Sequence, residues 1–242
     1  MKLYGLIGFP LSHSFSKKYF TNKFQTEGIT DTVYELFPLS SITELPALLA
    51  AHPQLCGLNV TIPYKQEVLP YLDDKRGLPL QACNCIKIVA GKLIGFNTDV
   101  VGFEQSFIEK LQPHHKKALI LGTGGAALAV QYVLSKLNIP FTLVSRSAGA
   151  GYTYEQLTKN ILEDFTIIIN TTPVGTFPKH DECPSLPYDY ISSKHYCYDL
   201  VYNPAMTLFL EKAAVQGATI KNGSDMLKIQ ADESWDIWNS GE

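Results

Sequence analysis

The residues best suited to chemistry form a glycine-rich turn, Gly122-Thr-Gly-Gly-Ala126. An apolar run, residues 118–121, precedes it, and a helix-like segment to residue 137 and a second apolar run, residues 141–144, follow. This order of strand, glycine turn, helix and strand predicts a dinucleotide site, because glycines let the backbone turn tightly and approach a pyrophosphate. The N–H groups at the start of the helix would face the phosphates. A purely structural turn is the alternative.

Arg146, after the second apolar run, indicates which dinucleotide would bind. NAD sites usually carry Asp or Glu here, about 20 residues beyond the glycines, to bind the ribose 2′-hydroxyl. Residues 142–147 contain no acid, and Arg146 lies between Ser145 and Ser147. A guanidinium pairs well with a phosphate, so we predict NADP as the cofactor. A solvated surface arginine is the alternative.

Composition excludes several function classes. The 242 residues carry a net charge of −3, with 45% apolar and 18% charged residues, which fits a globular protein and gives no nucleic-acid or membrane signal. No apolar run could span a bilayer, and the N-terminus reads as a strand rather than a signal peptide. Five cysteines without metal-ligand spacing fit buried thiols in a reducing cytosol. We therefore expect a cytoplasmic protein without a metal site.

Strand-like runs alternate with helical segments along the chain. In the second half this alternation predicts a doubly wound parallel sheet, with a loop at 148–151 and a short helix at 154–160. In the first half we expect three strands, then a hairpin of residues 81–89 and 92–96, and helices that include one beginning at Pro63. A final helix extends to Trp238.

Polar residues follow several strands of the first half. Asn59, Thr61 and Lys65 surround one strand end, which is where α/β sheets bind ligands. Ser14 and Ser16 precede the first helix. Taken locally, each also has an ordinary structural explanation, because serines cap helices and a lysine in a first turn is commonly exposed. The same holds for Asp99, which could be a capping acid.

Together these patches resemble the shikimate dehydrogenase family over almost the whole chain. The family motifs occur in the expected order: HSxS (His13–Ser16), NVTxPxK (Asn59–Lys65), Asn84, NTD (Asn97–Asp99), GxGGA (Gly122–Ala126), NTTPVG (Asn170–Gly175), YNP (Tyr202–Pro204) and GxxMLxxQA (Gly223–Ala231).

The resemblance implies an α/β fold of two domains with the active site in the cleft between them. Residues 1–101 and 223–242 would form an N-terminal α/β substrate domain, and residues 102–222 a Rossmann-type doubly wound parallel-sheet NADP domain. The implied reaction is the reversible, NADPH-dependent reduction of 3-dehydroshikimate to shikimate, in the shikimate pathway of aromatic amino acid biosynthesis. The implied partner is this small-molecule substrate, and family members occur as monomers or homodimers.

The resemblance also implies roles for individual residues. Lys65 and Asp99 would be the catalytic pair, in which the carboxylate favours the charged lysine that donates the proton. Ser14 and Ser16 would bind the substrate carboxylate, with Tyr202 near the ring or its carboxylate. The ring hydroxyls would bind Asn59, Thr61, Asn84 and Gln230. The cofactor would bind Gly122, Thr123, Gly124, Gly125, Ala126, Ser145, Arg146, Asn170, Thr171, Thr172, Val201 and Gly223.

Three departures from the family pattern stand out. Cys85 replaces the usual threonine, Lys17 the common proline, and no second basic residue follows Arg146 within a few positions. Three alternatives stay open: a quinate/shikimate dehydrogenase that uses NAD, an enzyme like methylenetetrahydrofolate dehydrogenase, and a catalytically silent NADP-binding regulatory protein. The serine turn and the Gln230 motif argue against the second, and the presence of both Lys65 and Asp99 argues against the third.

Overall fold

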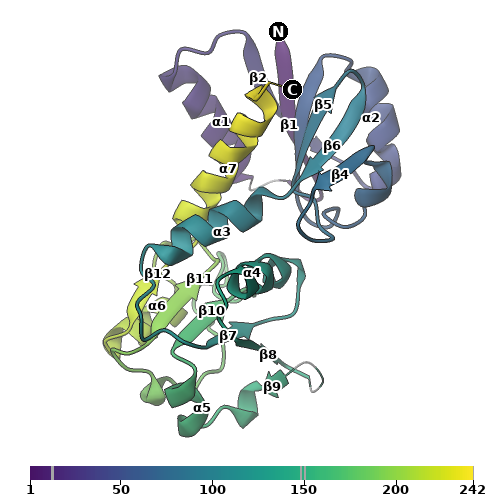
Figure 1. The fold of residues 1–242 in the computed structure, drawn as a ribbon. Helices are drawn as coiled ribbons and strands as arrows, with labels where there is room; N and C mark the ends of the chain where they lie inside the picture. Colours follow the sequence, from purple (N-terminus) through teal and green to yellow (C-terminus); the bar gives the residue numbers. More distant parts are fainter. Residues whose placement is uncertain (12–13, 148, 150, 242) are drawn as a thin grey trace. The chain divides into compact units, whose positions relative to one another are not determined.

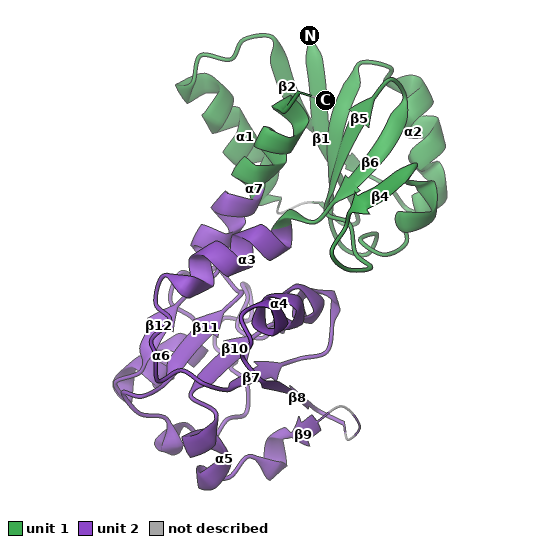
Figure 2. Ribbon diagram, in the orientation of Figure 1, with its two compact units in different colours: residues 1–98, 231–242 green, residues 99–230 purple. Residues whose placement is uncertain are grey.

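The chain forms two compact units, each built on its own six-stranded sheet (Figures 1 and 2). The structure, a computed structural model, describes residues 1–11, 14–147, 149 and 151–241. Unit 1 contains residues 1–98 and 231–242, and unit 2 contains residues 99–230. His13 of the serine motif and two residues of the 148–151 segment, Ala148 and Ala150, lie outside the described residues.

Unit 1 has a mixed sheet in the order β2-β1-β3-β5-β6-β4. Its parallel centre joins β1 to β2 and β3, and the predicted hairpin follows as the antiparallel pair β5 and β6, with Ala90 and Gly91 at positive φ in the turn. The strands are β1 (Lys2–Gly8), β2 (Thr32–Pro38), β3 (Leu55–Val60), β4 (Asp74–Gly77), β5 (Cys85–Val89) and β6 (Lys92–Phe96).

Both faces of this sheet are covered, as strand β1 shows. Leu3 and Ile7 belong to one buried cluster, whereas the alternate residues Tyr4 and Leu6 belong to another. The first cluster includes residues of α2 and the segment after β3; the second includes α1 and the end of α7 (Figure 1). The helices are α1 (Phe15–Thr26), α2 (Leu45–Ala51) and α7 (Ser224–Asn239), with short 3-10 helices η1 (Ile42–Glu44) and η2 (Leu69–Tyr71).

Unit 2 has an all-parallel sheet in the order β12-β11-β10-β7-β8-β9. The chain builds outward from β7 to β9 and then from β10 to β12 on the other side, which is the Rossmann order with its switch point between β7 and β10. The predicted parallel sheet is therefore confirmed. The strands are β7 (Ala118–Leu121), β8 (Phe141–Ser145), β9 (Gly151–Thr153), β10 (Ile167–Asn170), β11 (Tyr196–Asp199) and β12 (Thr219–Lys221).

Helices flank the sheet of unit 2, and one of them, α4, begins at the glycine turn (Figure 1). Leu119, Leu121, Ile168 and Cys197 from the strands pack with helix residues in one buried cluster. The helices are α3 (Thr98–Ile108), α4 (Gly125–Lys136), α5 (Lys159–Asp164) and α6 (Leu208–Val215), with η3 (Tyr154–Gln156), η4 (Tyr188–Tyr190) and the first half of α7.

Two local predictions are wrong. No helix begins at Pro63: residues 62–68 form successive turns that bury Tyr64 and Val68, and Pro70 has no N–H with which to continue a helical ladder. The predicted helix at 154–160 is instead η3 followed by α5, because Thr158 is extended and buried Leu157 lies between them.

The segment predicted as a loop at 148–151 ends in strand β9. Gly151, with a φ of 143°, lets β9 approach β8, since a Cβ there would lie 2.2 Å from the Leu143 carbonyl oxygen. The edge strand β4, which carries the charged sequence DKRG, lacks the apolar alternation that would have predicted it. Cys83 precedes β5 and Cys85 begins it, and the two thiols belong to different buried clusters.

Trp238 provides a main contact between the C-terminal helix and the sheet of unit 1. Its indole stacks on Tyr4, with ring centroids 4.7 Å apart, and its Nε1 donates to the Ile86 carbonyl oxygen at 2.9 Å. Gly57 makes room for it, because a Cβ there would lie 2.3 Å from Nε1.

We therefore expect Gly57→Ala to destabilise unit 1 by about 1–3 kcal/mol, because the methyl group would displace the indole and break its hydrogen bond. Urea unfolding followed by tryptophan fluorescence measures the effect. Gly241→Ala is the matched control, since a Cβ there would meet nothing within 4 Å. Equal midpoints for Gly57→Ala and the control would contradict this account of the docking.

Candidate active site

A cavity of about 550 Å³ lies in unit 2 at the carboxyl ends of β7, β8 and β10. This is the switch point of the sheet, where open α/β sheets bind their ligands. Residues that line it are Gly122, Thr123, Gly124, Val144, Ser145, Arg146, Ser147, Tyr154, Glu155, Thr171, Thr172, Pro173, Val174, Cys183, Pro184 and Ser185.

The glycine turn leaves space for a phosphate-sized group. Gly122 has a φ of 106°, and a Cβ there would lie 2.9 Å from Thr172 Cγ2, so the turn requires glycine. A Cβ at Gly124 or Gly125 would instead meet nothing within 4 Å. Gly124 is the N-cap of the twelve-residue helix α4, whose first N–H groups have no partner within the helix. The turn therefore fits the pyrophosphate of a dinucleotide.

The end of β8 supplies the charged wall of the cavity. Arg146 is exposed there between two serines, and the Ser145 hydroxyl donates to the Ser147 carbonyl oxygen at 2.5 Å. Tyr154 lies near the guanidinium: burial raises the pKa of its phenol, and Arg146 partly opposes this rise. A cation with hydroxyl neighbours fits a phosphate group.

A buried carboxylate, Asp199 at the end of β11, holds the two loops that follow β10 and β11. Its Oδ1 accepts from Asn170 Nδ2 at 2.9 Å and from the Val201 N–H at 3.0 Å, and its Oδ2 accepts from the Thr207 hydroxyl at 2.6 Å. Asn170 Oδ1 in turn accepts from the Thr172 N–H and hydroxyl. The network thereby fixes the turn that brings Thr172 against Gly122.

Seven of the predicted cofactor residues line the cavity and five do not. Gly125, Ala126, Asn170, Val201 and Gly223 are absent from its lining. Asn170 and Val201 belong to the Asp199 network, and Gly223 lies against β11, since a Cβ there would be 2.2 Å from the Leu200 carbonyl oxygen. Sequence reasoning missed Glu155 and the segment 183–185, because no local motif places either beside the glycine turn.

In unit 1, the predicted substrate residues Asn59 and Asn84 are buried, at 6% and 3% exposure. Asn59 Nδ2 donates to Ser234 Oγ at 2.9 Å and to the Asn84 carbonyl oxygen at 3.3 Å, and its Oδ1 accepts from the Tyr34 hydroxyl at 2.8 Å. Asn84 Nδ2 donates to Thr98 Oγ1, and its Oδ1 accepts from the Thr98 N–H. These amides connect β3, β5, α7 and the start of α3.

Thr61 and Lys65 follow β3 as expected, on the turns that replace the predicted helix. Tyr64 anchors this segment, because it is buried and its hydroxyl donates to the Leu39 carbonyl oxygen at 2.6 Å. The Lys65 carbonyl oxygen accepts from the Cys83 N–H at 2.7 Å. Thr61 and Lys65 both remain partly exposed.

Ser14 is the N-cap residue of α1, but its side chain makes no capping hydrogen bond. Its hydroxyl oxygen is buried and has no partner among the described residues. The structural alternative considered for Ser14, a helix-capping side chain, is therefore wrong. Ser16 follows in the first turn of α1. A buried hydroxyl with this unmet capacity suits a ligand.

Asp99 and Gln230 lie on α3 and α7 in unit 2, whereas Lys65 lies in unit 1. The two helices approach closely at Gly102, where a Cβ would lie 2.6 Å from the Met226 carbonyl oxygen and 3.1 Å from Gln230 Cβ. Tyr202, after β11, is 37% exposed, and burial raises the pKa of its phenol. The pairing of Lys65 with Asp99 stays a prediction.

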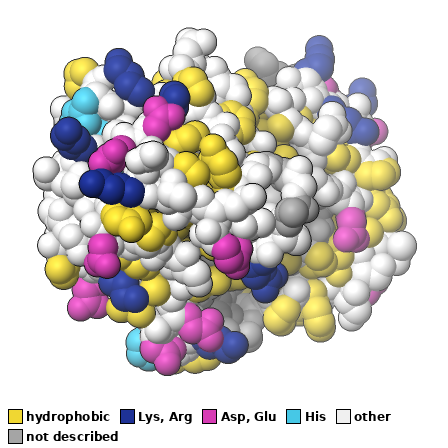
Figure 3. Space-filling view, turned by 90° about the horizontal axis from the view of Figure 1, so that it is seen from below, with side chains coloured by type: hydrophobic (Ala, Val, Ile, Leu, Met, Phe, Trp, Pro, Cys, Tyr) yellow, Lys and Arg dark blue, Asp and Glu magenta, His cyan; other side chains and the backbone are white. Residues whose placement is uncertain are grey.

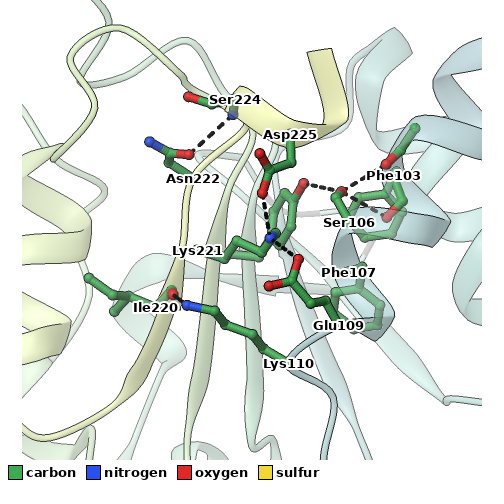
Figure 4. A network of polar contacts seen from close by, with 12 residues as sticks. Phe103, Ser106, Phe107, Glu109, Lys110, Ile220, Lys221, Asn222, Ser224 and Asp225 are labelled. Carbon is green, nitrogen blue, oxygen red and sulfur yellow. Dashed lines mark hydrogen bonds and ion pairs between the residues drawn. The ribbon is translucent and has the colours of Figure 1, made fainter. Parts of the chain in front are cut away.

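An ionic network fixes the same two helices to β12 (Figure 4). Buried Lys221 Nζ donates to Glu109 Oε2 at 2.5 Å, just beyond α3, and to Asp225 Oδ2 at 2.7 Å, in the first turn of α7. Burial alone would lower the pKa of Lys221, but the two bonds outweigh burial and raise it. Ser106 and Tyr198 add a hydrogen bond of 2.6 Å between α3 and β11.

Two properties of the described residues bear on other kinds of site. None of the helices in this part of the chain is long and apolar enough to cross a membrane. The same residues contain no group of three His, Cys, Asp or Glu side chains arranged to hold a metal ion. On the face drawn in Figure 3, acidic and basic side chains are interspersed.

Asp199 predicts a pH dependence of stability. Burial raises its pKa from 3.8 to about 6, although the bonds from Thr207, Val201 and Asn170 lower it. Because the folded state holds the proton more tightly than the unfolded state, this carboxyl stabilises the fold below pH 4, and the contribution is lost as the pH rises through about 6. The change is on the order of 2–3 kcal/mol.

Urea unfolding of the wild type and of Asp199→Asn at intervals from pH 4.5 to 7.5 tests this expectation. The stability difference between the two proteins should shift over this range, since asparagine does not titrate. A difference that stays constant across the range would contradict the pKa assigned to Asp199.

Comparison with known proteins places the chain among relatives. A model of the shikimate dehydrogenase substrate binding domain matches residues 6–86. A shikimate dehydrogenase (NADP+) of Methanococcus maripaludis strain C6 is 37% identical over 98% of this chain and 91% of that protein.

Two solved structures match nearly the full length. Shikimate 5-dehydrogenase of Thermus thermophilus, in complex with NADP(H) and shikimate, superposes with a TM-score of 0.85 at 27% identity, covering 99% of this chain and 94% of that one. Quinate dehydrogenase of Corynebacterium glutamicum, in complex with NAD, gives 0.86 at 26% identity, covering 98% and 93%. The extent and identity of the match to the Methanococcus protein show that this chain belongs to the shikimate dehydrogenase family.

Proposed function

We propose that this chain is an NADP-dependent shikimate dehydrogenase, which reversibly reduces 3-dehydroshikimate to shikimate. The observation that carries the proposal is the cavity at the switch point of unit 2, where the glycine turn fits a pyrophosphate and Arg146 fits a 2′-phosphate. Family membership adds the substrate class, since the curated relative is a shikimate dehydrogenase (NADP+).

The domain assignment predicted from the sequence is part of this proposal. Residues 1–101 and 223–242 bind the substrate, and residues 102–222 bind NADP. The nicotinamide ring supplies the hydride when the cofactor is bound. The site residues of unit 1 and its neighbouring helices then bind the substrate, orient it or move a proton.

Lys65 donates a proton to the oxygen of the substrate carbonyl while the carbonyl carbon accepts the hydride. An ammonium suits this role, and the Asp99 carboxylate favours the charged form of the lysine. In the reverse direction the neutral lysine takes the proton from the substrate hydroxyl. The anchoring of its neighbour Tyr64 limits the freedom of the backbone that carries Lys65.

Ser14 and Ser16 bind the substrate carboxylate, and this role is supported by the buried Ser14 hydroxyl, which has no hydrogen-bond partner among the residues that the structure describes. Thr61, Asn84 and Gln230 bind the ring hydroxyls, with Tyr202 near the ring. We revise the role of Asn59, because both of its amide hydrogens and its carbonyl oxygen bond protein groups in the interior. Asn59 positions Asn84 and α7 rather than contacting the substrate.

Absorbance at the nicotinamide band, with shikimate and either NADP or NAD, tests the function directly. Reduction of NADP only in the presence of shikimate supports the proposal. Turnover of quinate with NAD would favour the quinate dehydrogenase alternative, which the match to the Corynebacterium enzyme keeps open. Thermal stabilisation by NADP without turnover of either acid would leave a nucleotide-binding protein and exclude the proposed reaction.

Lys65→Ala should lower kcat by about 10²–10⁴-fold, with a smaller change in KM for shikimate, because it removes a positioned proton donor. Steady-state kinetics of shikimate oxidation measure both constants. Lys92→Ala, an exposed lysine of β6 in the same unit, is the control and should match the wild type. A kcat within threefold of the wild type would remove Lys65 from the chemistry.

A further inference from the structure

The connection between β8 and β9 is unusually short for parallel strands. Ser145 ends β8 and Gly151 begins β9, so five residues separate two strands that normally need a crossover of a dozen or more. The parallel register pairs Val144 with Tyr152 and Ser145 with Thr153. The residues after β9 therefore emerge at the same edge of the sheet as those after β8, directly beside them.

This register brings a carboxylate to the wall that Arg146 forms. Arg146 and Ser147 follow Ser145, and Tyr154 and Glu155 follow Thr153, and all four residues line the same cavity. In a Rossmann unit, the end of the second strand meets the adenosine ribose, whose 2′ position distinguishes NADP from NAD. Glu155 could not be found from its distance to the glycine turn in the sequence, because it follows the third strand, β9, rather than the second, β8.

Glu155 is exposed and charged. Its backbone N–H and the Thr153 hydroxyl lower the pKa of the carboxyl group, so the side chain is ionised at neutral pH. It sits in η3, which a capping box between Thr153 and Gln156 fixes to the end of β9. The cavity wall thus carries one cation, which would attract a 2′-phosphate, and one anion, which would repel that phosphate and accept a hydrogen bond from a ribose hydroxyl.

We propose that Glu155 is a specificity-determining residue, which opposes Arg146 at the ribose and lets the chain bind NAD as well as NADP. The kinetic test of this inference rests on the proposed function, whereas the test by coenzyme binding does not. The carboxylate favours the free 2′-hydroxyl of NAD, and the guanidinium favours the 2′-phosphate of NADP. The balance between the two charges sets the ratio of the two affinities.

The experiment compares wild type, Glu155→Gln, Glu155→Lys and Arg146→Ala by calorimetric titration with NADP and with NAD. Glu155→Gln should raise the affinity ratio of NADP to NAD about three- to tenfold, and Glu155→Lys should raise it further. Arg146→Ala should lower the ratio. The effect of Glu155→Gln should shrink at higher ionic strength, because salt screens exposed charges.

Glu163→Gln is the control, since Glu163 is an exposed carboxylate of unit 2 on α5, paired with Lys159 and outside the cavity lining. Its ratio should equal that of the wild type. In kinetics of shikimate oxidation, the ratio of kcat/KM for NADP to kcat/KM for NAD should change as the ratio of affinities does. The change should lie in the KM for the coenzyme. Ratios for Glu155→Gln and Glu155→Lys within twofold of the wild type would overturn the inference. Shifted binding ratios without turnover would instead support Glu155 and refute the proposed reaction.

Discussion

The candidate nucleotide site depends on one backbone turn, at Gly122, and on what packs against it. The positive φ and the contact with Thr171 and Thr172 leave no room for a side chain. Thr171 closes this contact from the other side, since its hydroxyl and N–H both donate to the Leu121 carbonyl oxygen at the end of β7. The turn after β7 and the turn after β10 therefore form one structure.

That structure extends to β11 through a single buried acid. Asp199 bonds Asn170, Val201 and Thr207, so the loops after two neighbouring strands share one anchor. A carboxylate without exposure is costly unless its oxygens accept hydrogen bonds, and here three donors converge on it. These hydrogen bonds offset the free-energy cost of burying the carboxylate only when both loops are in place. The network therefore favours one conformation of the two loops.

In unit 1, buried neutral amides likewise link segments that are distant in the sequence. Asn59 and Asn84 link β3, the start of β5, the first residue of α3 and Ser234 of α7. These segments lie far apart in the sequence, and the hydrogen bonds fix which strand end faces which helix. In unit 2, close approach at Gly102 and the ions around Lys221 fix α3 against α7. Among the proposed substrate residues, Asn84 and Gln230 thus lie on segments held by buried polar contacts.

The sequence by itself determined the structural features that depend on local sequence patterns. The apolar runs and the spacing of glycines predicted the βαβ unit, the parallel sheet and the turn that frames the cavity, because strand, turn and helix propensities act over a few residues. It also determined the hairpin at Ala90 and Gly91 and the family motifs. It could not determine β9, the turns after Pro63 or the burial of Asn59.

The tertiary structure alone decided which side chains line the same cavity wall or share a hydrogen bond. The register of β8 and β9 brings Glu155 to the cavity wall that contains Arg146. The pairing of β10 with β11 lets Asn170 donate a hydrogen bond to Asp199. Register and order depend on packing between segments distant in the chain, and a single sequence carries no local signal of that packing.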